Sequence, residues 1–224
     1  MEAEGYGEYL KQVTPFTQPD KKLWKMNKDI RICFVGDSFV NGTGDETALG
    51  WAGRLSAAAN KGGASITCYN LGIRRNTSRD ILHRFEAECS ARLHEVCDGR
   101  VVLSCGVNDT AIENGAERVP YDESRANVRL LLNLAGKYKR VFVGPPPVAD
   151  TEHNERIMAL SNAFMEEAGA QGVPYIDLFS PLVSDARYML EVRGNDGSHP
   201  SARGYEKMTN IILASADWWF FANE

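Results

Sequence analysis

Residues 30–38 read Ile-Arg-Ile-Cys-Phe-Val-Gly-Asp-Ser, an apolar and β-branched run that ends abruptly in three small residues. Such a run is typical of a buried strand, and the glycine and aspartate that follow it favour a turn. Similar runs occur later in the chain, at 66–71, 101–105, 141–143 and 173–176. The sequence therefore predicts five strands.

Segments with a helical period alternate with these runs. Apolar residues recur every three or four positions at about 50–61, 78–97, 122–138, 152–171 and 201–216. In the second segment one apolar stripe comprises Ile81, Leu82, Phe85, Cys89, Leu93 and Val96. Because strands and helices alternate at this spacing, we predict an α/β fold in which helices cover both faces of a parallel sheet through right-handed crossovers.

The composition is that of an ordinary folded protein. The 224 residues include 25 basic and 30 acidic side chains, for a formal net charge of −5, and 43% are hydrophobic. This balance excludes a basic nucleic-acid-binding protein, a disordered chain and a bundle of membrane helices. No Cys-x-x-Cys pair occurs, so we expect reduced thiols at all five cysteines: Cys33, Cys68, Cys89, Cys97 and Cys105.

The two ends of the chain suggest how it is organised. Residues 1–26 are polar and aperiodic, which predicts an N-terminal extension of unknown role before a domain at 27–224. The start lacks an apolar signal, and no run of about 20 apolar residues occurs, so we expect a cytoplasmic protein without an integral membrane segment. The aromatic run at 218–221 is expected to pack on the core, with an exposed patch as the alternative.

Active sites of open parallel sheets are built from loops at the carboxyl ends of the strands. Small polar residues follow three of the predicted strands, and one late loop carries a fourth group. The groups are Gly36-Asp37-Ser38, Asn70-Leu71-Gly72, Gly106-Val107-Asn108-Asp109 and Asp196-Gly197-Ser198-His199. These four groups therefore contain the candidate catalytic residues.

Ser38 is a candidate nucleophile, because its hydroxyl would project at the sheet edge near unpaired backbone N–H groups. A serine needs an imidazole to accept its proton, and the imidazole needs a carboxylate to fix its tautomer. His199 and Asp196, three positions apart in a polar loop, fit these two roles. Alternatives stay open: Asp37 and Ser38 are common in turns, and His199 also suits a solvated position before a helix opened by Pro200.

Asn108 is a candidate oxyanion donor, because a side-chain amide at the sheet edge can donate to charge that develops in the transition state. An Asx-turn is the alternative role. The remaining histidines are His83, His94 and His153, which show no metal-ligand spacing and fall on predicted helices or at their edges. We expect them to be structural or solvated.

In this order, the four groups resemble the sequence blocks of the SGNH hydrolases, also called GDSL esterases or lipases. The resemblance covers about 30–216 and depends on Gly-Asp-Ser at 36–38, a glycine-bearing loop at 70–78, Gly-x-Asn-Asp at 106–109 and Asp-x-x-His at 196–199. It implies a three-layer α/β/α, flavodoxin-like sandwich with a five-stranded parallel sheet.

One position departs from the family pattern. The second block of the family often reads Asn-x-x-x-x-Gly-x-Thr, and its last glycine gives a backbone N–H to the oxyanion hole, whereas this chain has Arg75 there. Arg75 keeps the N–H but needs allowed dihedral angles, and it brings a guanidinium to the mouth of the site beside Arg74. The resemblance thus implies an oxyanion hole from Ser38, Asn108 and either Arg75 or the neighbouring Gly72.

The resemblance also implies a serine esterase or acylhydrolase without a metal or organic cofactor. Its substrates would be small or short-chain carboxylic esters or thioesters, cleaved through an acyl-Ser38 intermediate. Arg74, Arg75 and Arg193 are candidate binders of an anionic group on the substrate, with a role as surface charges as the alternative. Two other functions stay open, a silent SGNH-fold protein that binds acyl or sugar ligands and an acyltransferase to an acceptor other than water. The expected partner is a small-molecule ester and not nucleic acid, and a homo-oligomer stays open.

Overall fold

The computed structural model describes residues 29–219, so the predicted extension at 1–26 and residues Phe220 and Phe221 lie outside the described part. Its centre is a parallel sheet of five strands in the order β2-β1-β3-β6-β7. The strands are β1 (Ile30–Gly36), β2 (Ile66–Gly72), β3 (Asp98–Ser104), β6 (Lys139–Val143) and β7 (Tyr175–Ile176). The predicted parallel sheet is confirmed, and each predicted strand corresponds to one of these five.

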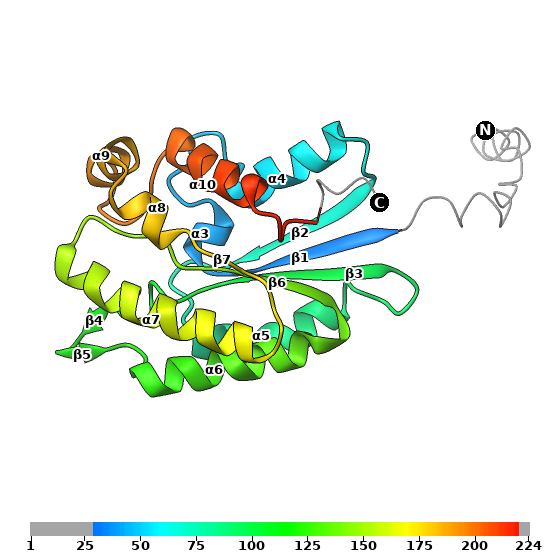
Figure 1. Cartoon of the computed structure of the whole chain (residues 1–224), viewed down its shortest axis with the longest axis horizontal. Coiled ribbons are helices and arrows are strands. Elements are labelled where there is room, and N and C mark those ends of the chain that lie inside the picture. Colours follow the sequence, from blue (N-terminus) through cyan, green and yellow to red (C-terminus); the bar gives the residue numbers. More distant parts are fainter. Residues whose placement is uncertain (1–28, 220–224) are drawn as a thin grey trace, which may run out of the picture.

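Helices cover both faces of the sheet and complete a three-layer sandwich (Figure 1). One layer contains α5 (Ser78–Ser90), α6 (Tyr121–Leu134) and α7 (Thr151–Ala170). The other contains α3 (Ser38–Asn41), α4 (Gly50–Lys61), α8 (Phe179–Val183), α9 (Ala186–Gly194) and α10 (Ala202–Ala214). A 3-10 turn, η1 (Ala135–Lys137), follows α6, and a separate antiparallel hairpin comprises β4 (Ile112–Glu113) and β5 (Ala116–Glu117).

Each face of the sheet has its own hydrophobic core. The central strand β1 contributes to both, because Ile32 and Phe34 join the core beneath α4 and α10, whereas Cys33 and Val35 join the core beneath α5 to α7. Alternate side chains of a strand point to opposite faces, and a strand covered on both sides is apolar throughout. The continuous apolar run that precedes Gly36 therefore identifies an interior strand.

The strand order changes direction beside β1. The chain passes from β1 to β2 on one side and then to β3 on the other side of β1. In open parallel sheets, ligands bind at the carboxyl ends of the strands at such a switch point. Ser38 follows β1 and Asn108 follows β3, so the topology places both at this point.

One predicted helix is shorter than its apolar pattern indicated. Helix α5 ends at Ser90, because the N–H groups of Arg92 and Leu93 bond to the Cys89 carbonyl and the chain then turns towards β3. Leu93 remains buried, but Val96 is 88% exposed, so its assignment to the buried stripe was wrong. The other four predicted helices correspond to α4, α6, α7 and α10 within a few residues.

The C-terminal aromatic run packs on the core as far as the structure describes it. Trp218 is buried, and Trp219 packs against the core beneath α4 and α10. All five cysteines are free thiols. Within residues 29–219, no helix combines the length and the apolar character needed to cross a membrane.

Candidate active site

The chain turns sharply as soon as β1 ends. Gly36 lies so close to the neighbouring strand that a Cβ would be 2.2 Å from the Ser104 carbonyl oxygen. Asp37 then caps α3, because its Oδ1 accepts a hydrogen bond of 2.9 Å from the Phe39 N–H. Ser38 is therefore the first residue of a short helix, where backbone N–H groups have no intrahelical partner, and its side chain is buried.

Ser38 contacts the late loop that carries Asp196 and His199. His199 Nε2 is 2.7 Å from Ser38 Oγ, and His199 Nδ1 is 2.7 Å from Asp196 Oδ2. Asp196 Oδ1 also accepts hydrogen bonds from the N–H groups of Ser198 and His199, so the loop folds around this carboxylate. The structure thus brings Ser38, His199 and Asp196 into one hydrogen-bonded chain.

The surroundings of His199 favour a fixed, hydrogen-bonded imidazole. Partial burial of Asp196 opposes its ionisation, but hydrogen bonds from His199 and Ser198 outweigh burial and lower the pKa of Asp196. The His199 ring is buried and packs on Phe39, with ring centroids 4.7 Å apart. An imidazole held by a carboxylate at one nitrogen can accept a proton at the other. The arrangement therefore has the parts needed to activate the Ser38 hydroxyl.

Asn108 connects the loops that follow three neighbouring strands. It lies in the turn after β3, and its Nδ2 donates to the Asn76 carbonyl at 3.0 Å and to Asp37 Oδ2 at 3.4 Å. Asn76 follows β2, and Asp37 follows β1. The Asn108 amide is therefore held beside the residue that precedes Ser38.

The two candidate donors of the second block differ in their hydrogen bonds. Gly72 N–H donates to Asn70 Oδ1 at 3.0 Å, and a Cβ at Gly72 would lie 2.2 Å from Asn41 N, so this glycine is needed for close packing against α3. Arg75 has a φ of 66°, in the left-handed region that favours glycine. Among residues 29–219, no acceptor bonds with the Arg75 N–H. Arg75 therefore offers the free donor of the two.

The three arginines predicted near the substrate are exposed. Arg75 forms an ion pair with Glu113. Arg193 lies in the last turn of α9, and neither it nor Arg74 forms an ion pair within the described range. None of the three guanidinium groups bonds with Ser38 or His199 in that range.

Two buried carboxyl groups, those of Asp37 and Asp109, lie next to Ser38 and Asn108 in the chain. The pattern Gly-x-Asn-Asp did not indicate the role of Asp109. Asp109 is fully buried and accepts hydrogen bonds from Ser78 N–H at 2.7 Å and Ser124 Oγ at 2.8 Å, which tie α5 and α6 to the turn after β3. Burial raises the pKa of Asp109 and raises the pKa of Asp37 to about 7. The position of Asp109 in the motif was visible in the sequence, but its partners on distant helices were not.

The other histidines lie apart from Ser38. His153 Nε2 is 3.1 Å from the Val107 carbonyl oxygen, and burial lowers the pKa of His153, as expected for a structural residue. His83 is exposed on α5, and His94 is exposed in the turn after α5 rather than on a helix. Within the described part of the chain, no group of three His, Cys, Asp or Glu side chains is placed to hold a metal ion.

Solved structures of several hydrolases resemble the chain over most of its length. A lipase/acylhydrolase from Enterococcus faecalis is 25% identical, with 82% of this chain and 93% of that chain covered and a TM-score of 0.68. A mutant of the acetylxylan esterase Axe2 from Geobacillus stearothermophilus is 16% identical, with 88% and 99% covered and a TM-score of 0.73. The esterase EstA from Pseudoalteromonas, inhibited by monoethylphosphonate, is 18% identical, with 84% and 97% covered and a TM-score of 0.64. No curated protein matches the sequence. Residues 34–207 match the GDSL-like lipase/acylhydrolase family.

Proposed function

We propose that this chain, which belongs to the GDSL-like lipase/acylhydrolase family of ester-bond hydrolases, is a serine esterase that works through an acyl-Ser38 intermediate. The observation that carries the proposal is the pair of 2.7 Å contacts that joins Ser38 Oγ through the His199 ring to Asp196. Ser38 and His199 are 161 positions apart, so the fold as a whole creates their contact. A nucleophile, a base and an orienting carboxylate are the groups that acyl transfer from an ester requires.

The proposed reaction has two steps. Ser38 Oγ attacks the ester carbonyl carbon while His199 Nε2 accepts the hydroxyl proton, and His199 then gives this proton to the alcohol oxygen as the bond to the carbonyl carbon breaks. Water attacks the acyl-Ser38 in the second step, and His199 accepts its proton and returns it to Ser38 Oγ as the carboxylic acid leaves. Asp196, whose pKa is lowered, stays ionised and stabilises the imidazolium in both steps.

We assign the oxyanion hole to the N–H groups of Ser38 and Arg75 and to Asn108 Nδ2. Ser38 N–H stands at the start of α3, and Arg75 N–H has no acceptor among the described residues. Asn108 Nδ2 donates to the Asn76 carbonyl at 3.0 Å and to Asp37 Oδ2 at 3.4 Å, and the longer of these two bonds can be exchanged for one to the developing oxyanion. One such donor typically contributes a factor of ~10²–10³ to kcat.

For the substrate we propose a small or short-chain ester or thioester. One structural relative is an acetylxylan esterase, which makes an acetyl ester the first compound to test. An anionic group on the substrate would meet Arg74 more readily than Arg75. The guanidinium of Arg75 is already paired with Glu113, whereas Arg74 forms no ion pair within residues 29–219.

The test compares hydrolysis of p-nitrophenyl acetate, butyrate and octanoate by the wild type, Ser38→Ala and the control Ser56→Ala. Ser56 lies on α4, where its Oγ donates to the Ala52 carbonyl and also bonds with the Cys68 thiol, and neither contact involves Ser38 or His199. We expect Ser38→Ala to lose ~10⁶ in kcat, as nucleophile removal does in a serine hydrolase, and Ser56→Ala to match the wild type. A Ser38→Ala protein as active as the wild type would refute the proposal.

A phosphonate ester distinguishes a wrong substrate from a wrong nucleophile. A p-nitrophenyl phosphonate transfers its phosphonyl group to an activated serine and releases p-nitrophenol, so mass spectrometry identifies the labelled residue. We expect label on Ser38 in the wild type and none in Ser38→Ala. A wild type that hydrolyses none of the three esters and takes up no label would favour a silent binding protein.

A further inference from the structure

Arg75 has a backbone conformation that its residue type disfavours. Its φ is 66°, and in this region the Cβ of an L-residue crowds the backbone, which glycine avoids. The flanking backbone is fixed, because Asn76 N–H bonds to the Ile73 carbonyl and the Asn76 carbonyl accepts from Asn108. The backbone beside Arg75 is therefore held in place, and an interaction of the Arg75 side chain can stabilise one backbone conformation at Arg75.

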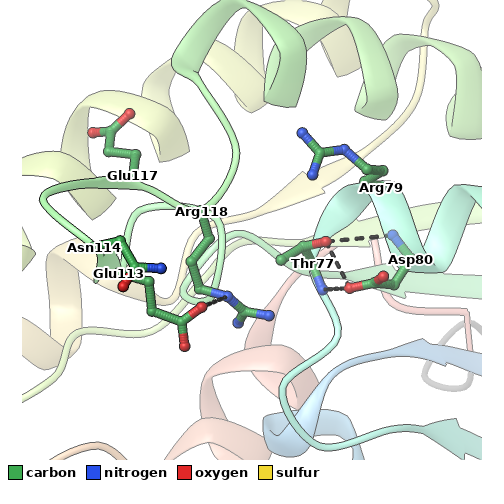
Figure 2. A pocket seen from close by; sticks show the side chains of 7 residues that line it. All are labelled: Thr77, Arg79, Asp80, Glu113, Asn114, Glu117 and Arg118. Carbon is green, nitrogen blue, oxygen red and sulfur yellow. Dashed lines mark hydrogen bonds and ion pairs between the residues drawn. The ribbon is translucent and has the colours of Figure 1, made fainter.

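Glu113 on the neighbouring hairpin provides such an interaction. Its carboxylate forms ion pairs with Arg75 on one side and with Arg118 Nε, at 3.2 Å from Oε2, on the other. Figure 2 shows Glu113 and Arg118 facing each other across from Thr77 and Asp80 at the start of α5. Glu113 and Arg118 line a polar cavity of about 350 Å³ at this place. The carboxylate is therefore held by two cations that come from different segments.

The hairpin that presents Glu113 is itself fixed near the site. Its turn residues Asn114 and Gly115 have φ values of 53° and 80°, as a two-residue type I′ turn requires. At its base, Val119 N–H donates to the Asp109 carbonyl at 3.1 Å, and Asp109 directly follows the proposed oxyanion asparagine. The hairpin therefore keeps the Glu113 carboxylate at a set place relative to the loops of the site.

We propose that Glu113 is a positioning residue for the oxyanion hole. Its ion pair with the guanidinium holds Arg75 in the left-handed conformation, in which the backbone N–H of Arg75 has no acceptor among residues 29–219 and can donate to the oxyanion. The inference rests on the proposed function, because it requires an esterase that uses Ser38 and the Arg75 N–H. In this role Glu113 touches neither the substrate nor the reacting atoms. Its ion pair stabilises at position 75 the left-handed conformation that a glycine would adopt unaided.

A double-mutant cycle on p-nitrophenyl acetate tests this role. We expect Glu113→Gln to lower kcat about threefold to fivefold, a small effect because the ion pair is exposed. KM should stay unchanged, because the oxyanion forms only in the transition state. Arg75→Gly keeps the N–H and adopts the left-handed conformation without help. In that background, Glu113→Gln should leave kcat within about 1.5-fold, because no side chain is left to hold.

Two controls separate positioning from a general effect of charge or folding. Glu117→Gln removes the same charge from the same hairpin, where Glu117 forms no ion pair within residues 29–219, and should match the wild type. Raising NaCl from about 0.05 M to about 1 M should lower kcat of the wild type by screening, but not that of Glu113→Gln. An equal loss from Glu113→Gln in both backgrounds, or a kcat equal to that of Glu117→Gln, would overturn the inference.

The same experiment distinguishes this inference from the proposed function. If Ser38→Ala is inactive while Glu113→Gln matches the wild type, the esterase stands and the positioning role is wrong. If Ser38→Ala is as active as the wild type, the proposed function fails and the positioning role fails with it.

Discussion

Asp37 directly precedes the proposed nucleophile and is buried, which makes it a titrating group of the folded protein. Desolvation, with added repulsion from Asp109, raises the pKa of Asp37 to about 7. In an unfolded chain the same carboxyl titrates at about pH 4. Between these two pH values the unfolded chain has lost the proton and the folded protein keeps it, so a rise in pH favours unfolding.

We therefore expect the free energy of unfolding to fall as the pH rises from about 4 to about 7, by ~4 kcal/mol at most for this one group. Asp37→Asn removes the titrating carboxyl and should reduce the slope, which urea unfolding at a series of pH values measures. The exposed Asp217→Asn is the control and should keep the slope of the wild type. Equal slopes for wild type and Asp37→Asn would show that the carboxyl ionises normally in the folded protein.

For single residues, the sequence identifies the chemical groups but not their hydrogen bonds. Ser38, Asn108 and His199 could be selected as candidates from residue type, motif and position after strands. The N–H of Gly72, one of the two donors considered for the second block, bonds to the Asn70 side chain in the fold, and the sequence did not indicate this bond. An asparagine side chain has several local partners within reach, and no sequence pattern states which one it takes.

Among the elements, the segment between α3 and α4 supports the loop that carries His199. Tyr205 Oη donates to the Thr43 carbonyl at 2.7 Å, which ties the segment to α10. Gly44 follows with a φ of 87°, and a Cβ there would lie 3.2 Å from His199 Cβ and 2.4 Å from Asn195 Nδ2. A side chain at Gly44 would therefore push directly on the loop that positions the imidazole.

We expect Gly44→Ala to lower kcat on p-nitrophenyl acetate about tenfold to a hundredfold, because a small displacement of a catalytic group has effects of this size. Gly63→Ala is a matched control. Gly63 has a similar φ of 91°, but a Cβ there would meet nothing within 4 Å. The control should lose stability in urea by a similar backbone strain and keep its kcat. Equal kcat values for the two variants would contradict the supporting role of the segment.

The five long helices and the strands of the sheet could be predicted from the sequence, whereas the hairpin β4-β5 and the short helices α3, α8 and α9 could not. Helix α4 begins and ends where its apolar period indicates, because twelve residues show the period several times. The hairpin has strands of two residues each, too short for alternation, although Asn114-Gly115 is a strong signal for a two-residue turn. Helix α9 shows only three buried side chains, and its better signal is the cap at Asp185, which accepts from two N–H groups.

In the whole molecule, both cores and all four groups of candidate residues lie within the described range. We therefore expect a chain shortened to 27–224 to unfold at the same urea concentration as the full chain and to hydrolyse p-nitrophenyl acetate with the same kcat. Urea titration and steady-state kinetics on both chains measure this. A shortened chain that unfolds normally but has a changed kcat would show that residues 1–26 act on the site, and one that fails to fold would move the domain boundary.

The fold class follows from the sequence because strands and helices alternate along the whole chain, but the order of the strands does not. Both neighbours of β1 are apolar enough to be strands, yet β2 lies at the sheet edge and β3 in the interior. The difference is visible in burial, because β2 has exposed side chains such as Thr67, whereas Val101 to Ser104 of β3 are buried. One exposed threonine in a short run is too little to assign an edge from the sequence alone.

The sequence separation of 161 from Ser38 to His199 also matters for how the protein is synthesised. A ribosome delivers the serine with the first strand, but the imidazole follows only after nearly all of the sheet and its covering helices have been synthesised. Contacts of such large sequence separation slow folding, because the cost of closing the long loop comes before the contact stabilises the chain. If Ser38 acts as proposed, a nascent or truncated chain carries this serine without its base, and esterase activity should appear only after the chain as far as His199 has been synthesised and folded.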